Sequence, residues 1–128
     1  MIYIDSSVAL ARLFLEPRSP PGRFWEQQLV SSRLLEYEVW NRVHAYGLTG
    51  SHANEASVLL VGIELVEMEG PVLAGALEPP PTPLRPLDAL HLATMHFMRG
   101  RTDAMELASY DNRLAVAARA LGIPLAGL

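Results

Sequence analysis

The sequence predicts an α/β fold in which helices flank a mostly parallel central sheet, and three observations support this. Segments of strand composition alternate with segments of helical periodicity along the chain, as in a parallel sheet with helical crossovers. Residues 2–4 are apolar at every position, which is typical of a strand buried on both faces. Half of the 128 residues are hydrophobic, so we expect residues 1–128 to form one domain with its own core.

The N-terminal half is expected to contain strands and a pair of antiparallel helices. Leu35, Val39, Val43 and Tyr46 form one apolar stripe at helical spacing. Ser51 is a candidate cap for the helix that follows. The expected elements are strands at 2–4, 29–32 and 63–68, helices at 8–14, 34–46 and 53–61, and a short helix at 23–28.

The C-terminal half is expected to continue the alternation. The proline-rich run at 78–83 is interpreted as a stiff loop within the same fold. Pro86 suits the first turn of a helix, and Gly122 suits the end of the last one. The expected elements are helices at 72–77, 87–98 and 112–121, a strand at 104–109, and a short strand at 123–126.

The composition excludes several classes of protein. The chain has no cysteine, which excludes disulfide frameworks, thiol nucleophiles and cysteine zinc sites. All ten basic residues are arginine, whereas P-loop enzymes, receiver domains and haloacid-dehalogenase-type phosphatases need a lysine. The N-terminus lacks the basic region of a signal peptide, and no apolar run is long enough to span a bilayer. We therefore expect a cytoplasmic protein without a membrane partner.

The net charge of −4 is compatible with a substrate that contains phosphate. Nucleic-acid binders usually carry a basic surface, but the fourteen acids need not be equivalent. If four of them form a metal site, the other ten balance the ten arginines.

Three aspartates lie where a parallel sheet places its ligands. Asp5 and Asp111 each end an apolar strand and precede a helix, and Asp88 lies in the first turn of an apolar helix. Because the carboxyl ends of parallel strands share one edge, all three can converge there. Other interpretations stay open. Asp5 or Ser6 could simply cap a helix, and Asp88 could interact with the helix dipole.

A fourth acid is expected from the helix at 34–46, where Glu36 and Glu38 compete. Periodicity does not choose well between them. Glu36 falls amid the apolar stripe, and Glu38 could instead form a surface pair with Arg42.

Four blocks of the sequence resemble PIN-domain ribonucleases, most closely the VapC-type toxins of toxin–antitoxin pairs. The blocks are residues 3–8, 31–39, 84–93 and 109–115, and they occur in order at suitable spacing. The resemblance implies a PIN-like three-layer sandwich. It also implies a catalytic, metal-binding quartet of Asp5, Glu38, Asp88 and Asp111. Glu38 is preferred over Glu36 because it directly precedes the apolar Val39.

The resemblance implies a divalent-metal-dependent endoribonuclease that cleaves single-stranded regions of RNA and is bound by a protein antitoxin. Ligands that are all oxygen suit Mg²⁺ or Mn²⁺. Two other functions stay open: a catalytically silent PIN fold used for binding or assembly, and a metal-dependent phosphatase acting on small molecules.

Residues near the acids are candidates for substrate contacts. Three polar residues adjoin acids and could hold metal-bound waters, although helix capping explains each of them at least as well: Ser6, Ser7 and Asn112. Arginines close to the acids in sequence are candidate phosphate contacts: Arg12, Arg33, Arg42 and Arg113.

The remaining candidates favour structural interpretations. His91 lies one turn after Asp88; it could touch the edge of the site, but a packed, hydrogen-bonded histidine is favoured. Three aromatic side chains could stack on bases, but packing is favoured for all of them: Trp25, Tyr37 and Trp40. The helices at 34–46 and 53–61 carry more apolar residues than one small sheet needs, so we expect a homodimer.

Overall fold

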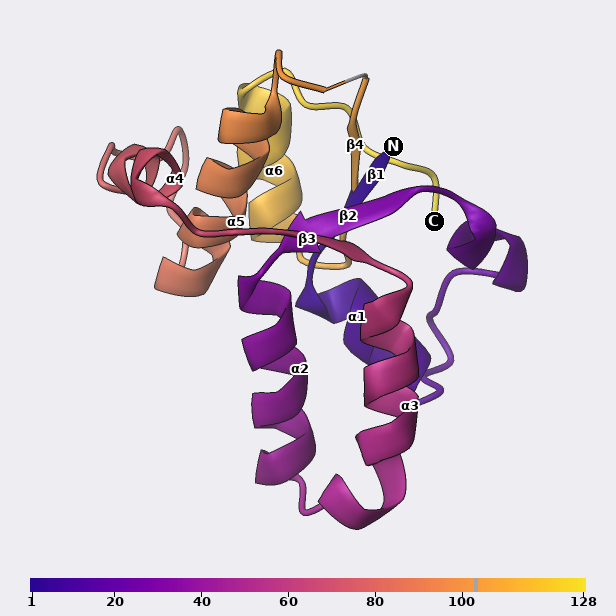
Figure 1. The fold of residues 1–128 in the computed structure, drawn as a ribbon. Helices are drawn as coiled ribbons and strands as arrows, with labels where there is room; N and C mark the ends of the chain where they lie inside the picture. Colours follow the sequence, from indigo (N-terminus) through magenta and orange to yellow (C-terminus); the bar gives the residue numbers. More distant parts are fainter. Residues whose placement is uncertain (103) are drawn as a thin grey trace.

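The centre of the molecule is a four-stranded parallel sheet. The computed structural model describes residues 1–102 and 104–128. The strands are β1 (Ile2–Ile4), β2 (Leu29–Ser32), β3 (Glu64–Val66) and β4 (Glu106–Ala108). Their order is β3-β2-β1-β4, and every pairing among the described strands is parallel (Figure 1). The predicted α/β fold with a mostly parallel sheet is confirmed.

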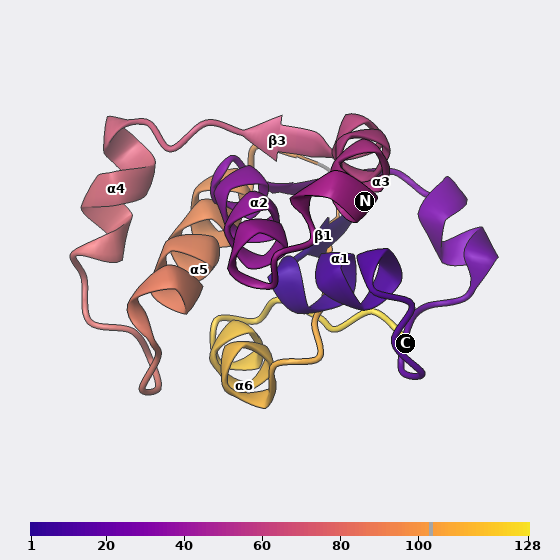
Figure 2. The ribbon, with the colours of Figure 1, turned by 90° about the horizontal axis from the view of Figure 1, so that it is seen from below.

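Helices cover both faces of this sheet, which makes three layers (Figures 1 and 2). On one face, Ile2 and Ile4 of β1 pack in a core with helices α1 to α3. On the other face, Tyr3 packs with α5 and α6. This division follows from the alternation of side chains along a strand. The helices are α1 (Ser6–Leu13), α2 (Leu34–Ala45), α3 (Thr49–Val61), α4 (Gly70–Ala76), α5 (Pro86–Met98) and α6 (Asn112–Ala120), with a 3₁₀ helix η1 (Gly22–Glu26).

Two expected details are wrong. The helix expected at 53–61 begins at Thr49, so Ser51 lies inside its first turn and its hydroxyl donates to the Leu48 carbonyl instead of capping the helix. The strand expected at 123–126 is reduced to one parallel bridge between Leu107 and Leu125. Pro124 has no N–H to donate, so a ladder cannot extend through it.

The carboxyl ends of the strands bring distant segments to one edge of the sheet. β1 runs into α1 through Asp5, and β4 runs into α6 through Asp111. In Figure 2, α1, α2, α5 and α6 surround one central area of the view. Among the described residues, no helix is long and apolar enough to cross a membrane.

Candidate active site

A pocket of about 650 Å³ lies at this edge of the sheet, and all four acids of the expected quartet line it. Asp5 follows β1, Glu38 comes from α2, Asp88 from α5, and Asp111 precedes α6. The segments that carry them are far apart in the sequence. Three arginines also line the pocket: Arg18, Arg42 and Arg85.

Asp5 is a buried carboxylate, with 3% of its surface exposed. Its two oxygens accept hydrogen bonds from the hydroxyls of Ser7 and Ser109, each at 2.6 Å, and it also caps α1 through the Val8 N–H at 3.4 Å. Burial raises the pKa of Asp5, and the bonds from Ser109 and Ser7 offset part of this rise. Among the described residues Asp5 forms no ion pair.

Two serines fix Asp5 by linking the segments that follow β1 and β4. Besides donating to Asp5, Ser7 accepts from the Tyr110 N–H at 2.8 Å, and Ser109 accepts from the Asp111 N–H at 2.9 Å. Both hydroxyls therefore use their single proton on Asp5. This arrangement holds an ionised carboxylate in a fixed orientation.

Asp88 and Asp111 share one cation, Arg85. Its guanidinium donates to Asp88 at 3.2 Å and to Asp111 at 2.8 Å. Burial raises the pKa of Asp88, and the nearby Asp111 charge adds to this, while Arg85 opposes it. Burial also acts to raise the pKa of Asp111, but the N–H groups of Leu114 and Arg113, together with Arg85, bring it below its usual value.

Glu38 is held through both oxygens. Ser6 donates to one at 3.1 Å, and Nε2 of the buried His91 lies 2.5 Å from the other. The favoured interpretation of His91 as a packed, hydrogen-bonded residue agrees with its full burial. It also touches the site, because its partner is one of the four acids.

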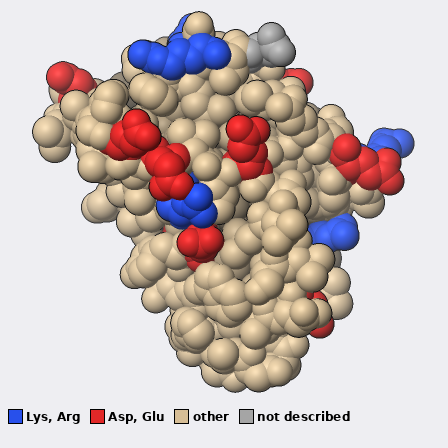
Figure 3. All heavy atoms as spheres, in the orientation of Figure 1, with Lys and Arg blue, Asp and Glu red and all other residues tan. Residues whose placement is uncertain are grey.

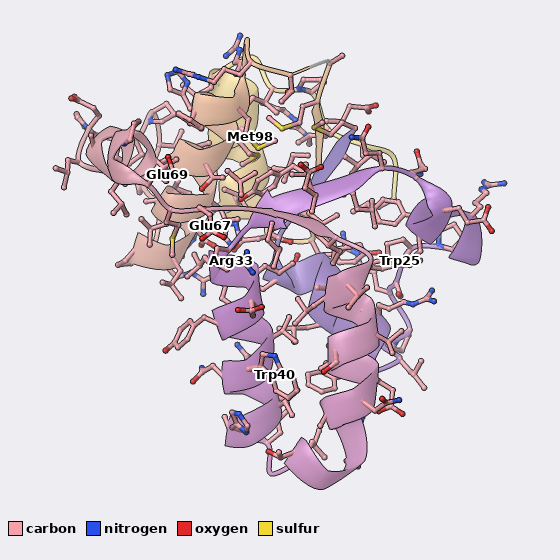
Figure 4. The ribbon with its side chains drawn as sticks, in the orientation of Figure 1. Trp25, Arg33, Trp40, Glu67, Glu69 and Met98 are labelled. Atoms are coloured by element: carbon pink, nitrogen blue, oxygen red, sulfur yellow. The ribbon has the colours of Figure 1, made fainter. Side chains whose placement is uncertain are left out.

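Glu36, the competing acid, faces another part of the surface. It pairs with Arg33 at 3.5 Å, and Arg33 pairs with Glu67 at 2.5 Å. Figure 4 shows Arg33 and Glu67 side by side at the start of α2. Neither Glu36 nor Arg33 lines the acidic pocket.

Only some of the expected substrate-contact residues line the acidic pocket. Ser6 lines the pocket. Arg12 lines a different groove, with its guanidinium carbon 5.1 Å from the centre of the Trp25 ring. Asn112 and Arg113 form the exposed start of α6, beside Asp111, and do not line the pocket.

Sequence reasoning missed two of the arginines that line the pocket. Arg85 precedes Asp88 by three residues, a spacing that could have indicated the pair. Arg18 lies over the ring of Tyr110, 4.5 Å from its centre. No signal in the sequence connects the two, because one follows α1 and the other follows β4.

The donor set suits a hard divalent cation. The pocket offers carboxylate and hydroxyl oxygens, the ligands that Mg²⁺ and Mn²⁺ prefer. Within residues 1–102 and 104–128, the buried Asp5 has only neutral hydrogen-bond partners, so a cation would offset the cost of its burial. In the described part of the chain, no three acidic or histidine side chains are clustered tightly enough to hold a metal. Arg85 takes the place of a cation between Asp88 and Asp111, so a metal that uses both must displace it.

Comparison with known proteins decides the family. The model of the PIN domain matches residues 2–120. The chain belongs to the PIN-domain family. It is 31% identical to ribonuclease VapC47 of Mycobacterium tuberculosis (strain CDC 1551 / Oshkosh), over 95% of this chain and 93% of that protein. It is 34% identical to ribonuclease VapC46 of strain ATCC 25618 / H37Rv, with the same coverage. The resemblance to VapC-type PIN ribonucleases is confirmed.

Proposed function

We propose that the protein is a divalent-metal-dependent endoribonuclease that cleaves single-stranded regions of RNA and acts as the toxin of a toxin–antitoxin pair. The observation that carries this proposal is the meeting of Asp5, Glu38, Asp88 and Asp111 in one pocket. The names of the relatives, which are ribonucleases, support the same chemistry. Because the substrate is RNA, we place its action in the cytoplasm.

The four acids are the residues that would hold Mg²⁺ or Mn²⁺. Such an ion supplies an activated water and neutralises charge on the phosphodiester. The chain itself supplies the orientation of the acids. Ser7 and Ser109 fix Asp5, while Ser6 and His91 fix Glu38.

The arginines that line the pocket suit contacts with the RNA backbone. Arg18 and Arg42 flank the acids and carry the charge that phosphate groups require. Arg85 contacts Asp88 and Asp111, and its guanidinium would suit a phosphate close to the reacting group if a metal were held by these acids. These contacts position the chain of the RNA without reading its sequence.

The two other functions have less support. A silent binding module would not need four carboxylates in one pocket, and here all four line it. A small-molecule phosphatase would use the same acids, so substrate choice must separate it from a ribonuclease.

The deciding experiment is cleavage of structured and unstructured RNAs by the purified protein with Mg²⁺, with Mn²⁺ and with excess chelator. We expect metal-dependent cuts in single-stranded segments, no hydrolysis of a generic phosphomonoester, and loss of cutting in Asp88→Asn. Glu36→Gln is the matched control, since this acid lies outside the pocket, and it should cut normally. Equal cleavage in chelator, or full activity of Asp88→Asn, would contradict the proposal.

We further propose a protein antitoxin that inhibits by placing an arginine against the acids, because a guanidinium binds carboxylates strongly and competes with metal. Arg85 already makes a contact of this kind within the chain. An antitoxin peptide that loses inhibition when its arginine is replaced would support the proposal. Inhibition that survives the replacement would contradict it.

A homodimer through α2 and α3 is also proposed. On the face drawn in Figure 3, the surface over these helices carries few charged side chains. Val58 and Val61 of α3 are 66% and 87% exposed. They lie one turn apart on the helix, and neighbouring exposed apolar side chains are typical of an interaction surface. Sedimentation at tens of micromolar should give a dimer, and a strictly monomeric mass would count against it.

A further inference from the structure

Three buried or half-buried side chains form a line from the centre of the sheet to the acidic pocket. Tyr3 of β1 is fully buried, and its hydroxyl lies 2.8 Å from Nδ1 of His91 in α5. Nε2 of His91 lies 2.5 Å from Oε1 of Glu38 in α2. The rings of Tyr3 and His91 meet edge to face at 86°. Three elements of the fold thus converge on one carboxylate.

The tautomer of His91 sets the direction of these hydrogen bonds. A carboxylate oxygen accepts, so Nε2 of His91 is the donor to Glu38. If Nε2 carries the only proton of the ring, Nδ1 accepts from the Tyr3 hydroxyl. Burial raises the pKa of Tyr3, so its hydroxyl keeps the proton that it donates.

A histidine that served packing alone would need hydrogen-bond partners, but none of them would have to be an acid of the pocket. His91 directs its proton at a side chain that is 11% exposed and lines the pocket. The other oxygen of Glu38 accepts from Ser6. Two donors from different elements thus restrain the carboxylate, as outer residues orient ligands in metal sites.

We propose that His91 is a positioning residue for Glu38: its Nε2 restrains the carboxylate, and the hydroxyl of Tyr3 fixes the orientation of its ring. This proposal rests on one part of the proposed function, that Glu38 helps the pocket to bind a divalent metal. His91 acts through Glu38 and does not touch the reacting atoms.

The first test needs neither metal nor RNA. ¹⁵N spectra of the metal-free protein labelled in its histidines should show a proton on Nε2 of His91, with the assignment made from the signal lost in His91→Gln. Tyr3→Phe removes one hydroxyl and keeps the ring, and it should change the Nδ1 signal while the proton stays on Nε2. A His91 ring without a proton on Nε2 in the wild type would overturn the proposal.

The second test measures Mn²⁺ binding by calorimetry. His91→Leu removes the donor and should weaken binding by about 10- to 100-fold, the usual effect of losing an outer residue of a metal site. His91→Gln keeps an N–H near the position of Nε2 and should recover much of this loss, and Tyr3→Phe should cost less than the leucine variant. His96→Gln, an exposed histidine on the same helix, is the matched control and should bind like the wild type.

The outcomes separate this proposal from the proposed function. If the wild type binds Mn²⁺ but cuts no RNA, the function fails while the binding series still tests His91. If folded His91→Leu binds Mn²⁺ like the wild type, or the wild type binds no Mn²⁺, the positioning role is overturned. If His91→Leu does not fold, Tyr3→Phe and the spectra decide.

Discussion

Asp5 and Asp111 occupy equivalent places in the sequence, each at the tip of a strand and before a helix, yet their surroundings differ. Both cap the helix that follows. Asp5 is almost completely buried and bonded to two serine hydroxyls and an amide, and its pKa is raised by burial. Asp111 lies at the pocket wall with the Arg85 guanidinium at 2.8 Å, and its pKa is lowered by donors and by Arg85.

The difference shows that helix capping and a role in the pocket are compatible. Asp111 uses one oxygen for the N–H groups of α6 and presents the other to Arg85. Asp5 lacks such a cationic partner in the described part of the chain, so its charge is the more costly of the two in the metal-free protein. A metal ion should therefore stabilise the protein mainly through Asp5.

The largest expected effect comes from replacing each aspartate by asparagine. Both changes should reduce RNA cleavage by about 100-fold or more. This is the upper end of the loss seen for residues that only orient metal ligands, and a ligand itself should matter at least as much. The stability of the metal-free protein should change in opposite directions. Asp5→Asn removes a costly buried charge and should melt at the same temperature or higher, whereas Asp111→Asn loses an ion pair and should melt slightly lower. Calorimetric melting in chelator measures this, and equal shifts of the same sign would remove the distinction.

A smaller effect is expected from metal and Arg85. Mn²⁺ at 100 times its dissociation constant should stabilise the wild type by about 2.7 kcal/mol, a rise in Tm on the order of 10 °C for a chain of this length. Arg85→Gln removes the cation between Asp88 and Asp111, so Mn²⁺ should bind several-fold more tightly. Because Arg85 is 66% exposed, the metal-free variant should lose less than about 1 kcal/mol.

Arg119→Gln is the matched control for Arg85, because this arginine is exposed on α6 and does not line the pocket. Its Mn²⁺ affinity should equal that of the wild type. Weaker binding of Mn²⁺ by Arg85→Gln would mean that the guanidinium helps the metal instead of competing with it. A wild-type Tm that does not change when millimolar Mn²⁺ is added would count against a metal at this site.

The sequence predicted the parts of the site that depend on local pattern. An apolar strand followed by an acid placed Asp5 and Asp111 at the edge of the sheet, and this holds in the structure. Asp88 followed from an acid at the start of an apolar helix. The choice of Glu38 over Glu36 needed the family resemblance, because both acids lie in the same part of one helix. Only their tertiary contacts distinguish them: Glu36 pairs with Arg33 on the surface, and Glu38 bonds to the buried His91.

What could not be predicted depends on contacts between distant segments. The bond from Ser109 to Asp5 spans 104 positions, and that from Arg85 to Asp111 spans 26. No periodicity encodes such pairs, because they exist only once the parallel strands are aligned. The early start of α3 at Thr49 was missed for a related reason. Serine is a residue type that often caps helices, so Ser51 was expected to precede the helix, but the turn after α2 is shorter than expected.

The smallest expected effect concerns pH, and it tests the pKa shifts of the two aspartates directly. The pKa of Asp5 is raised above its ordinary value of 3.8, so the folded protein holds this proton more tightly than the unfolded chain does. Its charge therefore costs stability as the pH rises above about 4, and below that pH the cost disappears.

The pKa of Asp111 is lowered, which gives the opposite sign. Its charge contributes stability above about pH 4, and this contribution is lost as the pH falls through the folded value. In chelator, the Tm of Asp5→Asn minus that of the wild type should thus increase from pH 4 to 7, while the same difference for Asp111→Asn should become more negative. Glu36→Gln, which changes an exposed acid outside the pocket, is the matched control for both variants. If the two aspartate variants instead followed parallel lines, burial and the Arg85 pair would not distinguish these two carboxylates.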